Sequence, residues 1–392
     1  MQYTLKRALN FIKAKDIGHL FLAVLVLPWA LIAKIFIRHF WLICEEKNEA
    51  RDNGYWLYKW ICENKPKQKV AYAINKKSPD YAKVEDLGKV ISYGTISHWF
   101  WYIVADKNIS SQKGGKPNAA VCYLFEVALK MRKNNRVFLQ HGVIKDKLEW
   151  LFYKNTNMRM FVTSTRQEYD YVVDYYGYPQ GYIQLCGLAR FDELHTAQVD
   201  KNLILVMPTW RNWLGRESHD NKDMDFGETE YCKKWNEFLN SKKLDEMLTK
   251  YGKKMLFYPH RNMQKFLQYF DTQSQNIEIA DWKNYDIQDV LKRAALMITD
   301  YSSVFFDFAY MRKPVIFYQF DEKEFREKQY AEGYFDYHNN SLGEWCGDID
   351  ECLILLDKQL SADCPPNDNI REFFEIYDDK NCQRTYEAIK NI

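Results

Sequence analysis

His141 is the side chain of this sequence best placed to do chemistry. It follows the apolar run 136–139 and precedes Gly142, whose missing side chain lets a ligand approach closely. An imidazole titrates near neutral pH, so His141 can take a proton from a hydroxyl nucleophile. A lone histidine is more often structural than catalytic. The position of His141 at the end of a predicted strand is what favours the catalytic interpretation.

A second group of residues suits an anion such as phosphate. Asp300, Ser302 and Ser303 stand between an apolar run and a helical stretch that continues from Val304. Free backbone N–H groups at a helix start, with two hydroxyls added, favour a phosphate or pyrophosphate. The same residue types are good helix N-caps, so capping alone would also explain them. Asp307, one turn further on, can meet a hydroxyl of the same ligand or face solvent.

Basic side chains follow two further apolar runs. His260 and Arg261 come after one run, and Thr209 and Arg211 come after another. A histidine–arginine pair with a second arginine nearby would stabilise negative charge on a phosphoryl group during its transfer. For the arginines, simple solvation at the protein surface is equally compatible with the sequence.

These residues need strands whose carboxyl ends share one edge of a sheet, which is where ligands of such sheets bind. Short β-type runs alternate with helical patterns, which predicts an α/β fold with parallel sheets and right-handed crossovers. The predicted strands are 40–44, 69–73, 89–93, 103–105, 136–139, 161–163, 183–185, 202–207, 254–258, 296–299 and 315–318. The predicted helices are 54–63, 120–130, 166–176, 231–251, 287–293 and 303–311.

The pattern restarts near residue 200, and a length of 392 residues suggests two domains. We expect doubly wound domains at 38–198 and 199–392 that face each other across a cleft. In one version of this arrangement, the last helices of the second domain pack back on the first.

An apolar N-terminal segment precedes these domains. Residues 20–33 contain no charge, and residues 1–40 hold six lysines and arginines against Asp16 alone. A spanning helix needs about 20 apolar residues, and this run is shorter and contains Pro28. We expect residues 1–37 to lie on a membrane through their apolar face and basic flanks. A true span, a signal peptide and a buried core helix remain open. Both membrane interpretations place the remaining chain in the cytoplasm.

Composition and absent motifs narrow the function classes. A net charge of +2 argues against nucleic-acid binding through a global positive field. The nine cysteines lack C-x-x-C or zinc-finger spacing, which indicates free thiols in a reducing compartment. The sequence contains no G-x-x-x-x-G-K-[ST], G-x-G-x-x-G, G-x-S-x-G or H-E-x-x-H motif. No metal site and no resident cofactor are therefore predicted.

Five blocks, taken in order, resemble the CDP-glycerol glycerophosphotransferase family of teichoic acid primases and polymerases. They are VFLQHGVIKD (137–146), LCGLARFD (185–192), MPTWR (207–211), YPH (258–260) and ITDYSSVFFDFAYMRKPVIFYQFD (298–321). FWLICEE with ARDNGYWLYKWI (50–61) is similar to the opening of that family's domain. The resemblance covers residues 38–340. It implies a GT-B fold, in which two Rossmann-like domains hold a nucleotide donor mainly through the C-terminal one.

The resemblance also implies a reaction. The family transfers glycerol phosphate or ribitol phosphate from CDP-glycerol or CDP-ribitol to a hydroxyl of an undecaprenyl-type lipid-linked acceptor, with release of CMP. Such enzymes build wall teichoic acid or capsule and are peripheral proteins on the cytoplasmic face of the bacterial membrane. Two alternatives stay open: a nucleotide-sugar glycosyltransferase of the same fold, and a non-catalytic, membrane-bound scaffold of a glycopolymer assembly complex.

Motif positions carry the family's site residues onto this chain. The resemblance implies that His141 is the general base, that His260 contacts the donor phosphates, and that Ser302 and Ser303 cradle the pyrophosphate. The remaining predicted residues are Thr209, Arg211, Arg261, Asp300 and Asp307 on the donor side, and Gly142, Arg190 and Asp192 near the acceptor or at the domain interface.

Overall fold

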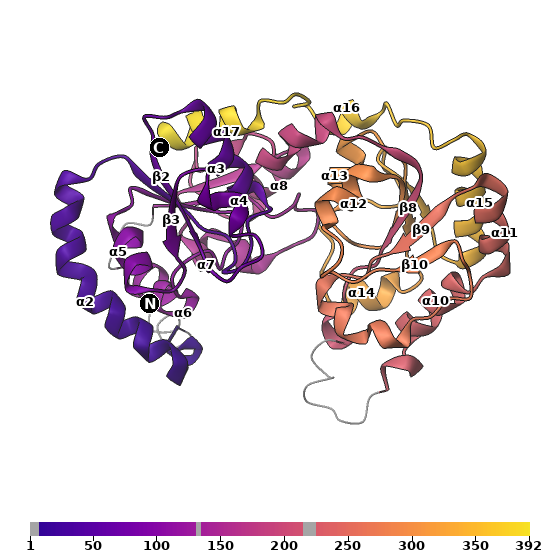
Figure 1. The fold of residues 1–392 in the computed structure, drawn as a ribbon, viewed down its shortest axis with the longest axis horizontal. Helices are drawn as coiled ribbons and strands as arrows, with labels where there is room; N and C mark the ends of the chain where they lie inside the picture. The colour runs from indigo at the N-terminus through magenta and orange to yellow at the C-terminus, as the bar shows by residue number, and fades with distance from the viewer. Residues whose placement is uncertain (1–7, 131–134, 215–224) are drawn as a thin grey trace. The chain divides into compact units, whose positions relative to one another are not determined.

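The structure is a computed structural model that describes residues 8–130, 135–214 and 225–392. The chain divides into two compact units (Figure 1). Unit 1 contains Met1–Val143, Leu148–Asp192 and Asp378–Ile392, and unit 2 contains Ile144–Lys147 and Glu193–Tyr377. The chain therefore enters unit 2 briefly just after His141, and its last helix returns to unit 1.

Unit 1 is built on a seven-stranded parallel sheet with the order β3-β2-β1-β4-β5-β6-β7. Phe40 of the first strand pairs with Lys69, and Trp41 pairs with Lys107 on the other side. The strands are β1 Phe40–Ile43, β2 Lys69–Ile74, β3 Lys89–Ser92, β4 Lys107–Ser110, β5 Arg136–Phe138, β6 Met160–Thr163 and β7 Ile183–Leu185. The helices are α2 Ala14–Phe36, α3 Asn53–Asn64, α4 Ala82–Glu85, α5 Ile96–Val104, α6 Ala119–Tyr123, α7 Tyr153–Thr156, α8 Arg166–Tyr175 and α17 Asn381–Lys390.

Both faces of this sheet are covered, which is why strands such as β1 and β6 read as nearly continuous apolar runs. Trp41 and Ile43 of β1 join a core with residues of α3 and α17. The alternate residues Phe40 and Leu42 join a second core with residues of α5 and α2. Every residue of β1 is buried as a result.

Unit 2 contains a six-stranded parallel sheet with the order β10-β9-β8-β11-β12-β13. Its main core surrounds the wholly buried Trp235. The strands are β8 Asp200–Met207, β9 Lys254–Phe257, β10 Ile277–Ile279, β11 Ala294–Thr299, β12 Val315–Tyr318 and β13 Glu344–Cys346. The helices are α10 Glu230–Leu239, α11 Lys242–Tyr251, α12 Ile287–Arg293, α13 Phe305–Tyr310, α14 Glu322–Lys328, α15 Ile349–Ser361 and α16 Ile370–Phe373.

The predicted α/β class with two parallel sheets is confirmed, whereas some predicted elements are wrong. Residues 103–105 are not a strand, because the Thr95 side chain accepts a hydrogen bond from His98 N and begins helix α5 there. The predicted helix 231–251 is two helices, because Ser241 caps the start of a second one. The interior strand β4 and the short edge strands β10 and β13 were not predicted.

Helix α2 exposes an apolar face. It is the one helix of the described chain that is long and apolar enough to cross a membrane: it has 23 residues, and its most apolar 18-residue stretch has a mean hydropathy of 2.1. Only 17% of its most apolar stretch is buried, mainly through Ala23, Val26 and Ala30. Lys34 is not a free basic flank, because its Nζ donates to Ala105 O, 3.2 Å away at the end of α5.

Candidate active site

The backbone leading to His141 is held in an unusual conformation. His141 stands three residues after β5, and Gln140 before it has a left-handed φ of +68°. Asn53 Nδ2 donates to Gln140 O at 2.7 Å, and Gln140 Nε2 donates to Glu168 Oε1 at 3.1 Å. A non-glycine residue adopts positive φ only where its surroundings enforce it. The loop therefore presents His141 in one fixed orientation.

The ring of His141 is bonded on one nitrogen and open on the other. Its Nδ1 lies 2.5 Å from Asp52 Oδ2, and the side chain is 70% exposed. The amide Nε2 of Gln112 lies 2.8 Å from Nδ1 and 3.3 Å from Asp52 Oδ2. Among the described residues, none forms a hydrogen bond with Nε2 of His141. This nitrogen is therefore available to a substrate.

Arg190 holds both His141 and its partner. Its Nη1 donates to Asp52 Oδ1 at 2.9 Å and to His141 O at 2.7 Å. Its backbone N donates to Asn53 Oδ1 at 3.0 Å. Asp52 also caps α3, because its Oδ1 accepts a hydrogen bond from Asn53 N at 2.8 Å. The loop after β7 and the start of α3 thus meet at His141.

Glu45 lies behind this group, two residues after β1, and is wholly buried. Its carboxylate accepts hydrogen bonds from Gly54 N at 2.8 Å and from Tyr55 N at 3.1 Å. It also accepts bonds from the hydroxyls of Ser111 and Tyr72 at 2.9 and 3.0 Å. A buried carboxylate with this many donors fixes the first turn of α3, from which Asp52 reaches His141.

The charges of this cluster shift its pKa values. The charge of Asp52 raises the pKa of His141 above its ordinary value. Burial would raise the pKa of Asp52, but the charges of His141 and Arg190 outweigh it and lower that pKa. Burial and the charge of Asp52 together raise the pKa of Glu45 to about 7. The cluster therefore supplies an imidazole that binds a proton more strongly than a free histidine does.

The other predicted acceptor-side residues have different positions. Asp192 accepts hydrogen bonds from the backbone N atoms of Asn381 and Cys382, both at 2.8 Å, and so fixes the start of α17. Gly142 is half-buried and directly follows His141 in the chain. Both lie in unit 1, as Arg190 and His141 do.

In unit 2, the loops after β8 and β11 are joined through a buried arginine. Arg211 has no exposed surface, and its guanidinium forms ion pairs with Asp300 at 2.8 Å and with Asp321 at 2.7 Å. Its Nη1 donates to Thr209 O at 2.9 Å. Asp300 Oδ1 accepts bonds from Thr209 N at 2.7 Å and from Tyr301 N at 2.6 Å. Because Arg211 is wholly buried, it acts on the site only by fixing the positions of Thr209, Asp300 and Asp321.

His260 lies at the end of the adjacent strand β9. Its backbone N donates to Pro208 O at 3.1 Å, and its Nδ1 accepts from Asn262 N at 3.1 Å. A neutral ring whose Nδ1 accepts must carry its proton on Nε2, so Nε2–H can donate to a phosphate oxygen. The ring stacks on Trp210 with a centroid distance of 6.2 Å. Arg261 is exposed and lies over the ring of Trp282 at 5.0 Å.

The predicted anion cradle stands at the end of β11, the strand that pairs with β8. Ser302 and Ser303 are half-buried, and Ser302 Oγ accepts a hydrogen bond from Val304 N at 3.4 Å. Asp307 is buried within the short helix α13. The structure thus brings Thr209, His260 and the serines to the carboxyl ends of β9, β8 and β11.

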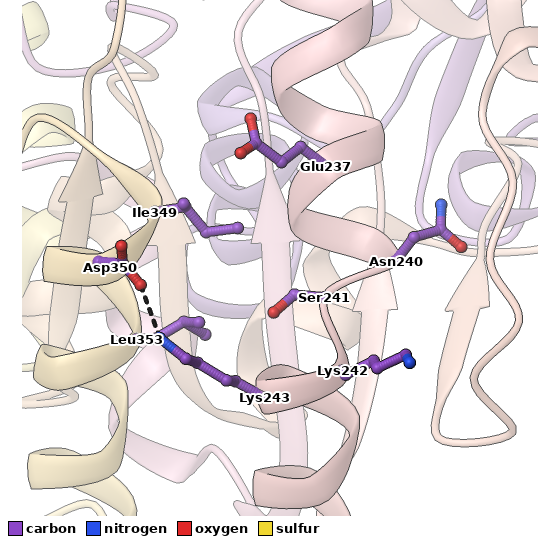
Figure 2. A pocket seen from close by; sticks show the side chains of 8 residues that line it. All are labelled: Glu237, Asn240, Ser241, Lys242, Lys243, Ile349, Asp350 and Leu353. Atoms are coloured by element: carbon purple, nitrogen blue, oxygen red, sulfur yellow. Dashed lines mark hydrogen bonds and ion pairs between the residues drawn. The ribbon is translucent and has the colours of Figure 1, made fainter.

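Figure 2 shows a shallow hollow elsewhere on unit 2, between the starts of α11 and α15. A Lys243–Asp350 ion pair of 2.9 Å crosses it. It contains none of the predicted site residues. The residues that line it are Glu237, Asn240, Ser241, Lys242, Lys243, Ile349, Asp350 and Leu353.

Several residues of the His141 cluster were missed from the sequence. Asp52 and Asn53 belong to the block ARDNG, which indicates the family resemblance but no role for either residue. Glu45 follows a predicted strand, so the rule that functional side chains come after strands would have found it. Gln112 stands two residues after β4, but the sequence did not predict that strand, so the same rule could not find it. Glu168 carries no comparable signal, because it reaches the loop of His141 through tertiary contact alone.

Comparisons with known proteins agree on one family. The family model described as CDP-Glycerol:Poly(glycerophosphate) glycerophosphotransferase matches residues 32–391. The minor teichoic acid biosynthesis protein GgaB of Bacillus subtilis (strain 168) is 31% identical over 363 residues, which are 89% of this chain and 39% of that protein. A teichoic acid poly(glycerol phosphate) polymerase of the same strain is 34% identical over 97 residues, which are 25% of this chain and 12% of the polymerase. The chain thus spans well under half of these curated relatives.

Solved structures share the fold. A structure of the wall teichoic acid polymerase TagF matches with a TM-score of 0.64 at 16% identity, over 97% of this chain and 98% of that one. A putative UDP-N-acetylglucosamine 2-epimerase from Listeria monocytogenes matches with a TM-score of 0.56 at 15% identity, over 90% and 95% of the two chains. At such identities the likeness concerns the fold alone.

Proposed function

Because this chain belongs to the CDP-glycerol:poly(glycerophosphate) glycerophosphotransferase family, we propose that it transfers an alditol phosphate from a CDP-alditol to an acceptor hydroxyl and releases CMP. The donor is CDP-glycerol or CDP-ribitol, and the acceptor is an undecaprenyl-type lipid-linked glycan of wall teichoic acid or capsule synthesis. The two parallel-sheet units are the two Rossmann-like halves of a GT-B fold. The observation that carries the proposal is His141, with Nδ1 held by Asp52 and Nε2 open.

The reaction needs a base. An acceptor hydroxyl has a pKa far above 7, so it is a weak nucleophile until a base removes its proton. In the proposed step, the hydroxyl oxygen attacks the phosphorus that carries the alditol, and its proton passes to Nε2 of His141. The bond from that phosphorus to the bridging oxygen breaks, and its electron pair leaves with CMP. Charge on this leaving oxygen is what the donor site must stabilise.

Unit 2 supplies the donor contacts in this proposal. Nε2–H of His260 donates to a donor phosphate oxygen, since its Nδ1 is occupied by Asn262 N. Ser302 and Ser303 contribute hydroxyls to the pyrophosphate. Arg211 keeps Thr209 and Asp300 in place from its buried position. Arg261 and Asp307 complete the set of candidate donor residues.

The membrane contact of the proposal is helix α2. Phe21, Trp29 and Ile35 are each more than 60% exposed on it. Lys13 and Lys15 near its start and Arg38 after its end are exposed as well. An apolar face flanked by cations lies in the interface of an anionic membrane. We assign the protein to the cytoplasmic face of the bacterial membrane, where lipid-linked acceptors would meet it.

A donor screen tests the proposal. The purified protein is incubated with CDP-glycerol, CDP-ribitol and UDP-sugars, each with a lipid-linked acceptor analogue, and the released nucleotides are measured. We expect CMP and an acceptor extended by an alditol phosphate. UDP release without CMP release would show a nucleotide-sugar glycosyltransferase instead. No turnover with any donor would favour a non-catalytic, membrane-bound scaffold of a glycopolymer assembly complex.

Two histidine variants sharpen the screen. His141→Ala should abolish CMP release while the protein stays folded. His338→Ala removes an exposed histidine that pairs with Glu322 in unit 2, and it should keep full activity. Equal activity of the two variants would refute the assignment of the base.

A further inference from the structure

Asp52 is the closest polar neighbour of the proposed base. Its Oδ2 lies 2.5 Å from His141 Nδ1, and its side chain is only 9% exposed. Its Oδ1 accepts the Arg190 guanidinium at 2.9 Å. One oxygen of the carboxylate thus faces the imidazole, and the other faces a permanent cation. This arrangement leaves Asp52 ionised and pointed at one ring nitrogen.

We propose that Asp52 is a positioning residue that keeps the proton of neutral His141 on Nδ1, so that the lone pair stands on the exposed Nε2. This inference rests on the proposed role of His141 as the base. An ionised carboxylate can only accept hydrogen bonds, so a ring nitrogen 2.5 Å away must be the donor. Gln112 Nε2 then donates to Asp52 Oδ2 at 3.3 Å rather than to the ring. During transfer, Nε2 takes the acceptor's proton and Asp52 stays ionised.

Glu45 and Arg190 make this geometry rigid. Glu45 binds the N–H groups of Gly54 and Tyr55 in the first turn of α3, which follows Asp52 directly. Added bulk at Gly54 would collide with this carboxylate, since a Cβ there would lie 2.8 Å from Glu45 Oε1. Arg190 Nη1 donates to the carbonyl of His141 and so fixes the backbone that carries the ring. The imidazole and the carboxylate are therefore both held before any substrate binds.

The charged groups around the imidazole oppose one another. Asp52 and Glu49 favour its protonated form, and Arg190 disfavours it. Glu45 lies close enough to Asp52 for the charge of Asp52 to raise the pKa of Glu45. Because Asp52 is the nearest of these groups, removing its charge should lower the apparent pKa of His141. The acidic limb of the pH profile would then move to lower pH.

The role of Asp52 as a helix cap can be separated from this one. Asparagine caps helices about as well as aspartate, so Asp52→Asn keeps the cap of α3 and removes the charge. An amide at this position can donate its N–H to Nδ1, which would leave the proton of the neutral ring on Nε2. Asp348 caps α15 by accepting from Glu351 N, and it lies in unit 2 and is not one of the predicted site residues, so Asp348→Asn is the control for removing the charge of a helix cap.

The experiment measures single-turnover CMP release from CDP-glycerol in the presence of a lipid-linked acceptor analogue, between pH 5 and 9, for the full chain and both variants. We expect Asp52→Asn to lower the rate by on the order of 10⁴-fold, as a misplaced tautomer does in the serine-protease triad. We also expect its acidic limb to shift to lower pH. Asp348→Asn should match the wild type. The inference would be overturned if the rate of Asp52→Asn were within twofold of the wild-type rate and the acidic limb of its pH profile stayed at the wild-type pH.

A spectroscopic readout keeps the test independent of activity. With ¹⁵N-labelled histidine, long-range couplings show which nitrogen of neutral His141 carries the proton, and the His141→Ala spectrum identifies the signal. We expect Nδ1–H in the wild type, and Nε2–H there would overturn the inference even if Asp52→Asn failed to fold. Retained activity of His141→Ala would instead refute the base itself. An inactive His141→Ala with an unperturbed Asp52→Asn would refute only the role of Asp52.

Discussion

Replacing Arg211 by methionine should destabilise unit 2 more than any surface change. The guanidinium of Arg211 is wholly buried, and it faces two buried carboxylates, those of Asp300 and Asp321. Its pairing with Asp321 is bidentate, with Nε at 2.7 Å and Nη2 at 2.9 Å. Methionine has a similar length and no charge. Arg211→Met therefore leaves both carboxylates buried without their cation.

The size of the effect follows from that burial. Removing one partner of a buried ion pair costs about 3–5 kcal/mol, because the remaining charge has lost its compensation. The carbonyl of Thr209 also loses its donor, although the loop can relax toward water. A surface pair is different: Arg293 lies 3.8 Å from Asp200 and is 58% exposed, so Arg293→Met should cost less than about 1 kcal/mol.

Urea unfolding of the wild type, Arg211→Met, Arg293→Met, Asp321→Asn and the Arg211→Met/Asp321→Asn double variant measures this difference at pH 7. We expect the free energy of unfolding to fall by about 3–5 kcal/mol for Arg211→Met and by less than about 1 kcal/mol for Arg293→Met. Adding Asp321→Asn to Arg211→Met should cost less than the two single changes do in sum, because one uncompensated charge is removed. A loss for Arg211→Met as small as that for Arg293→Met would refute the reasoning.

Two further changes test the membrane face and the buried carboxyl. Trp29→Glu with Ile32→Glu on α2 should weaken co-sedimentation with anionic vesicles at least tenfold, since each buried apolar side chain contributes about 1.5–3 kcal/mol. Ile354→Glu, an equally exposed site on α15, should leave binding unchanged, and equal binding by all variants would contradict the assignment. The pKa of Glu45 is about 7 in the native state, whereas its ordinary value is 4.5. Between these two pH values the native state binds a proton that the unfolded state has lost, so the free energy of unfolding falls as the pH rises from 4.5 to 7. Glu45→Gln should flatten this slope in thermal melts between pH 5 and 7, and an unchanged slope would count against the raised pKa.

The parallel sheets could be predicted because their strands are buried on both faces. β11 is buried at all six residues and reads as one apolar run, and β1 does the same over four. The edge strands Ile277–Ile279 and Glu344–Cys346 have three residues each, so their sequences carry too little pattern. Residues 103–105 were misassigned because the apolar end of a helix looks like a strand when Thr95, its cap, is ignored.

The residues of the candidate site also fall into two groups: those that local sequence pattern predicts and those that come together only through packing. His141, Thr209 and Asp300 follow strands, so the strand-end rule alone finds them. Asp52 cannot be found that way, because it caps a helix and meets His141 from 89 residues away. The burial of Arg211 is equally hidden, since its partner Asp321 is 110 residues further along the chain. Pairings of this kind depend on the packed structure rather than on local pattern.

The central claim is transfer of an alditol phosphate with His141 as the base. The most direct measurement is the mass of the products when the wild type and His141→Ala are each incubated with CDP-glycerol and a lipid-linked acceptor analogue. We predict that the wild type yields CMP and an acceptor that has gained glycerol phosphate through a new phosphodiester, and that His141→Ala yields neither. An unmodified acceptor with the wild type, or an extended acceptor with His141→Ala, would contradict the account.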